Sequence, residues 1–197
     1  MSDSAASRVL NCIERFLQSP ASEKYSLWRK GVTGALQEVL TVLHPTDVGP
    51  LVLSPNRFGP RAGVVWVAFL TPEISPSVQS GYYPLLLLDE ETRRIYVCLA
   101  VAWNQFGRRL SKSVALSKNL EVQRRLLAGV TTLLPTDTLT LSHSAPFARV
   151  LEQVCFGVMG IDLDDPTADV RLVAAFECVF GIYAEILATG NPQWLLN

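Results

Sequence analysis

The sequence predicts an α+β fold, with a mainly antiparallel sheet in the middle of the chain and helices on its N-terminal and C-terminal sides. Apolar residues recur at helical spacing near both ends, and runs rich in Val, Leu, Ile and Tyr fill the middle. Clusters of Pro, Gly, Ser and Asp separate those runs, as turns separate strands. With 197 residues, of which 49% are hydrophobic, the chain can bury a large core. We therefore expect residues 1–197 to form one domain.

Two amphipathic helices are predicted ahead of the sheet, over residues 5–17 and 24–43. In each, apolar residues return every three or four positions. Gly31 and Gly34 weaken the second helix, and His44-Pro45 predicts its end.

Four strands are predicted in the middle of the chain, at residues 51–54, 64–70, 82–88 and 94–102. The acidic segment 89–92 between the last two strands is typical of a hairpin turn. The run Tyr83–Leu88 is apolar on both faces, which predicts that it is a central strand of the sheet.

Three helices are predicted after the sheet. They cover residues 119–134, which Pro135 should close, residues 146–159, and a last helix that runs to about Ala188. Asp165-Pro166 is typical of a helix cap followed by Pro at the first helical position. Gly190-Asn191-Pro192 predicts the end of the last helix.

The chain carries no motif that argues for catalysis. Asp89-Glu90 follows an apolar strand, as the Mg²⁺-binding carboxylates of nucleotide-binding proteins do, but the phosphate-binding loop is missing. Ser142-His143-Ser144 fits a loop before a helix. Asp162, Asp164 and Asp165 fit helix capping, because the Glu that completes a calcium-binding loop is missing. We expect a protein without enzymatic activity, metal or cofactor.

The cysteines and the apolar runs indicate a cytoplasmic protein. The four cysteines lie in apolar segments without metal-ligand spacing, which favours reduced thiols in a reducing compartment. The apolar runs are too short to cross a bilayer, and the N-terminus lacks the pattern of a signal peptide.

The charges are unevenly placed although the formal net charge is −1. Residues 57–125 hold ten Lys and Arg against five Asp and Glu, a net of +5, whereas residues 126–197 hold two against eight, a net of −6. A basic stretch in a near-neutral protein can bind an anionic polymer through one face. Basic residues scattered over a solvated surface would give the same count.

The segment from Ser54 to Gly107 carries the most specific pattern. A glycine-containing loop at 57–63 precedes a strand with Trp66 at its centre, and Gly81-Tyr82-Tyr83-Pro84 opens the next strand. The strand after that leads into Asn104-Gln105-Phe106-Gly107. In order and spacing, residues 54–107 resemble the N-terminal DNA-binding domain family of McrB-type, modified-cytosine-specific restriction enzymes.

The resemblance implies recognition of modified double-stranded DNA, notably of methylated cytosine, by extrusion of the base into an aromatic pocket. Trp66 and Tyr83 match the pocket aromatics of the family. Leu87 should face the same side as Tyr83, because side chains four residues apart in a strand share a face. Tyr82 and Trp103 are further candidates for the pocket.

The resemblance also implies that the loop 57–63 approaches the DNA. The best-known type of member has an aromatic residue between two glycines there, whereas this chain has Pro60-Arg61-Ala62. Either Arg61 takes the place of that aromatic residue or the mode of entry differs. Contacts with the DNA through this loop and with phosphates are expected from seven basic residues: Arg57, Arg61, Arg93, Arg94, Arg108, Arg109 and Lys112.

The chain would then be the specificity module of a restriction system that acts in phage defence. In the systems that it resembles, a GTP-driven AAA+ module and a separate nuclease supply the catalysis, and either could be its partner. Two alternatives remain open. The same fold could serve as a protein–protein adaptor without DNA contact, or scattered acidic residues could form an unrecognised nuclease site.

Overall fold

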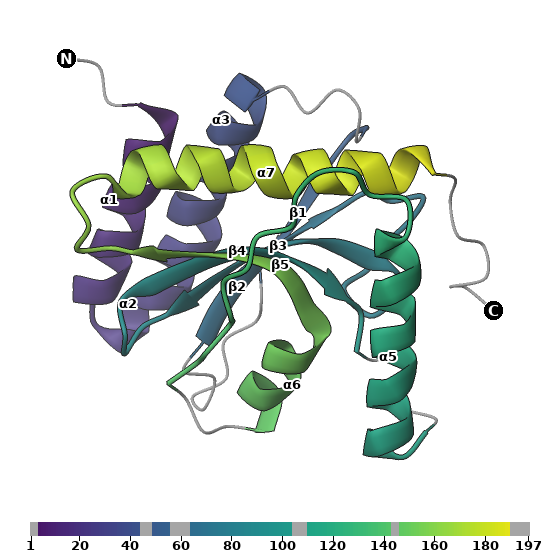
Figure 1. Cartoon of the computed structure of the whole chain (residues 1–197). Helices are drawn as coiled ribbons and strands as arrows, with labels where there is room; N and C mark the ends of the chain where they lie inside the picture. Colours follow the sequence, from purple (N-terminus) through teal and green to yellow (C-terminus); the bar gives the residue numbers. More distant parts are fainter. Residues whose placement is uncertain (1–3, 44–48, 56–63, 104–109, 143–145, 190–197) are drawn as a thin grey trace.

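A computed structural model describes residues 4–43, 49–55, 64–103, 110–142 and 146–189 (Figure 1). Within these residues five strands form one antiparallel sheet in the order β1-β2-β3-β4-β5. The strands are β1 (Val52–Pro55), β2 (Val64–Leu70), β3 (Tyr82–Asp89), β4 (Arg94–Val101) and β5 (Cys155–Asp162). The α+β class, the four predicted strands and the central place of Tyr83–Leu88 are confirmed.

The N-terminal helices are α1 (Ala5–Gln18), α2 (Ala21–Ser26) and α3 (Thr33–Leu43), with a π-helical segment, η1 (Leu27–Val32), between the last two. Ser4 caps α1, because its hydroxyl oxygen accepts a hydrogen bond from the Ser7 amide. The single helix predicted over residues 24–43 was incomplete, since helical structure begins at Ala21 and widens in η1. The Trp28 carbonyl accepts from both the backbone amide and the hydroxyl of Thr33, five residues later, as a widened turn allows.

The helix predicted over residues 119–134 was misplaced, because α5 spans Lys112–Leu127. The chain leaves the helix after Leu127 and crosses to the C-terminal helix α7 (Ala168–Ala188). There the amide and hydroxyl groups of Thr131 and Thr132 donate to the Glu185 carboxylate. These bonds take up backbone donors that a longer helix would have used.

The helix predicted over residues 146–159 combines two elements, α6 (Pro146–Val154) and the edge strand β5. The side-chain carboxamide of Gln123 in α5 donates to the backbone carbonyls of Gln153 and Val154 at 3.2 and 3.3 Å. These carbonyls lie at the end of α6 and would otherwise lack a donor within the helix. Gly157 follows with a φ of 57°, which a right-handed helix cannot accommodate. The helix therefore ends and the chain joins the sheet.

At the start of α7, two of the three acidic residues predicted to cap the helix bond to the local backbone, and the third, Asp164, pairs with Arg93. Asp162 accepts from the Asp164 amide, and Asp165 accepts from both the amide and the hydroxyl of Thr167. The N-cap position itself is Thr167, two residues later than the predicted one.

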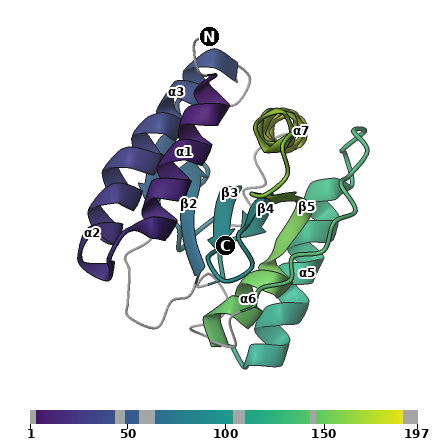
Figure 2. The same cartoon turned by 90° about the vertical axis from the view of Figure 1, so that its left-hand side faces the viewer.

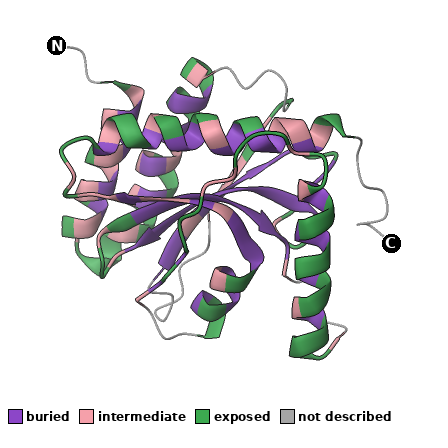
Figure 3. Ribbon diagram, viewed as in Figure 1, coloured by how far each residue is buried: buried purple, intermediate pink, exposed green. Residues whose placement is uncertain are grey.

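Each face of the sheet has its own apolar core. The first face, here called the helix face, packs against α1, α3 and α7, and its centre includes Phe69, which meets Phe176 and Phe180 edge to face. The opposite face, here called the pocket face, packs against α6 and the segment around Leu139 and Leu141. Figure 2 shows the sheet between these two sets of elements, and Figure 3 shows the strands as the most buried part of the chain. Both cores come from the alternation of side chains along the strands.

No helix in the described part of the chain is long and apolar enough to cross a membrane. Among the same residues, His, Cys, Asp and Glu side chains do not gather into a group of three or more that could hold a metal ion.

Candidate functional site

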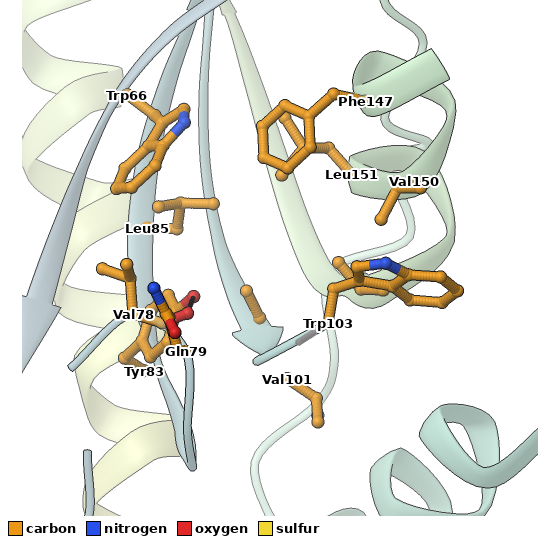
Figure 4. Close-up of a pocket in the computed structure, with 12 residues that line it drawn as sticks. Trp66, Val78, Gln79, Tyr83, Leu85, Val101, Trp103, Phe147, Val150 and Leu151 are labelled. Atoms are coloured by element: carbon orange, nitrogen blue, oxygen red, sulfur yellow. Dashed lines mark hydrogen bonds between the residues drawn. The ribbon is translucent and has the colours of Figure 1, made fainter. Parts of the chain in front are cut away.

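A pocket of about 130 Å³ opens on the pocket face, between the sheet and α6 (Figure 4). Four aromatic residues contribute to its walls. They are Trp66 from β2, Tyr83 from β3, Trp103 just after β4, and Phe147 from α6. The remaining lining residues are aliphatic, apart from Gln79: Val78, Leu85, Ala100, Val101, Val150, Leu151 and Val154. A flat, largely apolar group suits such walls.

The strand register explains why a hollow forms here. Tyr83 pairs with Ala100 of β4, and Leu85 pairs with Ala68 of β2, so small side chains alternate with large ones across the sheet. Trp66 pairs with Leu87 one step further along. Ala100, which lines the pocket, does not fill the space between the sheet and α6, and aromatic rings lie around that space.

The segment between β2 and β3 forms one wall of the pocket and is tied to the start of β3. The Tyr83 hydroxyl donates to the Val78 carbonyl at 2.9 Å, and the Ser75 hydroxyl donates to the Tyr82 carbonyl at 2.7 Å. At Gly81, φ is 81° and an added Cβ would lie 2.3 Å from the Ile74 carbonyl oxygen. Only glycine fits this close approach without strain, so Gly81 fixes how the segment folds back onto the sheet.

Tyr83 acts in the pocket as a neutral hydrogen-bond donor. Burial raises the pKa of its hydroxyl well above the ordinary value, and the nearby thiols of Cys155 and Cys98 raise that pKa further. The hydroxyl therefore keeps its proton at physiological pH and its bond to Val78 persists.

The structure brings Trp66 and Tyr83 together in this pocket. Leu87 lies on the same face and pairs with Trp66, but it is fully buried and does not line the pocket. Tyr82 faces the other way, into the helix-face core, where its ring meets Tyr183 edge to face at 5.8 Å. The sequence pattern placed Tyr82 and Tyr83 together, and strand alternation separates them.

Sequence reasoning named Trp103 as a further candidate, and that residue does line the pocket. It missed Phe147 and Gln79. Phe147 is 50% exposed on a helix whose packing the sequence did not reveal, and Gln79 lies in an irregular segment. The only sequence signal for either residue was that Phe147, a large apolar residue, lies at the start of the helix predicted over residues 146–159.

The basic residues expected to contact DNA are placed unequally. Lys112 is exposed at the first position of α5. Arg93 is bonded to two carboxylates, at 2.7 Å from Glu14 and 3.0 Å from Asp164, and hydrogen bonds to Asp164 and Glu14 raise its pKa. Arg94 is exposed and lies opposite Asp89 in the strand register, at the end of the β3–β4 hairpin away from Tyr83. Four further predicted residues lie outside the described residues, as does the loop 57–63: Arg57, Arg61, Arg108 and Arg109.

The fold and the site define an α+β domain with a pocket lined by aromatic residues on one face of its sheet. The chain belongs to the family described as MrcB-like, N-terminal domain, whose model matches residues 14–188. This match confirms the McrB-type resemblance and extends it from residues 54–107 to most of the chain. Neither the curated proteins nor the solved structures contained a match to this chain.

Proposed function

We propose that this domain binds double-stranded DNA and reads a modified base, notably methylated cytosine, by taking the extruded base into the pocket of Trp66, Tyr83, Trp103 and Phe147. One observation carries the proposal: Trp66 and Tyr83, which match the family's pocket aromatics, line one pocket together with two further aromatic side chains. The family assignment supports DNA as the ligand.

The chemistry of the walls supports a base rather than a phosphate as the group that enters. The described lining residues include no charged side chain, so the pocket offers no counter-charge to an anion. Aromatic rings instead stack on a base face, which contributes about 1–3 kcal/mol per base. The aliphatic residues between the rings, such as Leu85 and Val150, offer a niche for a methyl group.

Contacts with the DNA backbone would come from basic residues that flank the pocket in the sequence. Arg57 and Arg61 precede the strand of Trp66, while Arg108, Arg109 and Lys112 follow Trp103. Arg93 is already bonded to two carboxylates, and Arg94 lies at the far end of the hairpin, so we expect both to contribute less to DNA binding than the other basic residues. We further propose that residues 1–197 act in the cytoplasm as one specificity module, with a GTP-driven AAA+ module and a nuclease supplying catalysis.

Titration of the protein with a panel of matched duplexes tests this function. The panel carries different cytosine, adenine and backbone modifications, and fluorescence anisotropy reports binding. We expect one modified-base duplex to bind more tightly than its unmodified counterpart. Equal binding to all duplexes would contradict base reading, and no binding at low salt would favour a protein–protein adaptor. Cleavage on addition of Mg²⁺ or Mn²⁺ would reveal a nuclease instead.

A further inference from the structure

Gln79 supplies the pocket wall with its one side-chain carboxamide, as far as the described residues show. Figure 4 draws it on the same side of the pocket as Tyr83, across from Trp103 and Phe147. The Tyr83 hydroxyl is already bonded to Val78. Gln79 is therefore the lining residue best placed to offer an incoming ligand both a donor and an acceptor.

The backbone on both sides of Gln79 is held in place. The Val78 carbonyl accepts the Tyr83 hydroxyl, and the Gln79 amide donates to the Ser77 hydroxyl at 3.2 Å. The Ser80 amide donates to the Ser77 carbonyl at 3.2 Å. The side chain of Gln79 is itself exposed, so it can reach a ligand without first leaving the core.

An extruded base brings a polar edge into walls that are otherwise apolar. The pairing edge of cytosine has an amino donor next to a ring-nitrogen acceptor, and leaving such groups unpaired in an apolar site is costly. A carboxamide offers the complementary acceptor and donor, as Asn and Gln do when they read adenine in the major groove.

We propose that Gln79 reads the pairing edge of the extruded base, its oxygen accepting from the exocyclic amino group and its nitrogen donating to the ring nitrogen. This role rests on the proposed function. In it the aromatic walls hold the face of the base, while Gln79 makes the site responsive to the groups on its edge. Gln79 is thereby a specificity-determining residue.

Two duplexes and three variants test this role. One duplex carries 5-methylcytosine and the other carries a difluorotoluene nucleotide, which has a similar shape but hardly any hydrogen-bonding capacity. Each stands opposite an abasic site, so neither base loses a pairing partner on extrusion. The variants are Gln79→Leu, Gln79→Glu and the control Gln37→Leu, which makes the same change at an exposed position of α3.

We expect the wild-type protein and Gln37→Leu to bind the 5-methylcytosine duplex about tenfold more tightly than the difluorotoluene duplex, the modest net gain expected from two hydrogen bonds formed in exchange for bonds to water. Gln79→Leu should lose that tenfold factor and bind both duplexes alike, with an unchanged melting temperature. Gln79→Glu should bind the 5-methylcytosine duplex more weakly than the wild-type protein does, because its carboxylate can accept from the exocyclic amino group but cannot donate to the ring nitrogen.

A full tenfold preference in Gln79→Leu would overturn the role of Gln79. The variant Trp66→Ala separates that failure from failure of the function itself. If Trp66→Ala loses the 5-methylcytosine duplex while Gln79→Leu binds as the wild-type protein does, only the role of Gln79 is wrong. If neither substitution changes binding, the pocket does not take the base and both proposals are wrong.

Discussion

Tyr82 and Tyr83 are neighbours in the chain, yet their rings lie on opposite faces of the sheet and in different surroundings. The Tyr83 hydroxyl is bonded to the Val78 carbonyl. The Tyr82 hydroxyl is buried and has no hydrogen-bond partner in the described part of the chain. Removing the hydroxyl oxygen should therefore destabilise the protein at Tyr83 and not at Tyr82.

We expect Tyr83→Phe to lower the free energy of unfolding by about 1 kcal/mol, because the partly buried carbonyl of Val78 loses its donor. Tyr82→Phe should leave this free energy unchanged or raise it, because the variant no longer buries an unpaired hydroxyl. Urea unfolding of both variants measures the difference. A larger loss in Tyr82→Phe than in Tyr83→Phe would contradict the assignment of the two rings.

Trp66 should contribute to binding of modified DNA more than to folding. Its side chain is half-buried and lines the pocket, so Trp66→Ala should remove about 1–3 kcal/mol of stacking on an extruded base. Binding to unmodified DNA through phosphates does not use the pocket and should persist. Anisotropy titrations with matched duplexes test this.

Trp28 provides the control for that substitution. It is fully buried against Phe16, and its indole N–H donates to the Trp66 carbonyl at 3.2 Å. Trp28→Ala should lower the free energy of unfolding by about 3–5 kcal/mol and weaken both kinds of DNA binding together. If Trp66→Ala behaved in the same way as Trp28→Ala, Trp66 would be a core residue.

DNA binding should weaken steeply as salt rises, because residues 57–125 carry a net charge of +5 and each neutralised phosphate releases counterions. Arg61→Ala should weaken binding to modified and unmodified duplexes and reduce the slope of log affinity against log salt by about 0.9. Its effect on stability should stay within about 0.5 kcal/mol. A salt titration of wild type and variant gives both slopes.

Arg93→Ala is the matched control among the arginines. It removes a guanidinium that already bonds to Glu14 and Asp164, so the salt slope should stay at its wild-type value. The variant should lose about 1 kcal/mol of stability, as is usual for ion pairs near the surface. A reduced slope in Arg93→Ala would instead assign this residue to the DNA interface.

Glu185 should make folding sensitive to acid. Hydrogen bonds from the Thr132 hydroxyl and the Thr131 amide lower its pKa from the ordinary 4.5 to about 2. A carboxyl group whose pKa is lowered by folding stabilises the folded state above its unfolded pKa and loses this effect as the pH falls through the folded value. Glu185→Gln should melt at a lower temperature than wild type at pH 7, and the difference should shrink between pH 4.5 and about 2. A constant difference over this range would contradict the assignment.

The sequence predicted the central strands well because their local and tertiary preferences agree. Residues 64–70 and 82–88 are rich in strand-forming residues and are bounded by turn residues. The α5 helix was misplaced because its buried side includes the polar residues Asn119 and Gln123, which weaken the apolar stripe. The β5 strand was missed because its pairing with β4 is a long-range contact, and two glycines interrupt its pattern.

The candidate site was predicted only in part, for the same physical reason. Trp66 and Tyr83 belong to the sheet, where alternation fixes the direction of a side chain once the strand is known. Phe147 and Gln79 reach the pocket through the packing of α6 and the path of an irregular segment. Neither is encoded in a short sequence pattern.

The amide of Gln123 links α5 to the last carbonyls of α6, while Trp66 and Tyr83 are held by the hydrogen bonds of the sheet. The two sides of the pocket are therefore held in place by different sets of hydrogen bonds. Substitutions between α5 and α6 can change the distance from Phe147 to the sheet without disturbing strand register. The width of the pocket could therefore evolve through the helices alone, while Trp66 and Tyr83 stay the same.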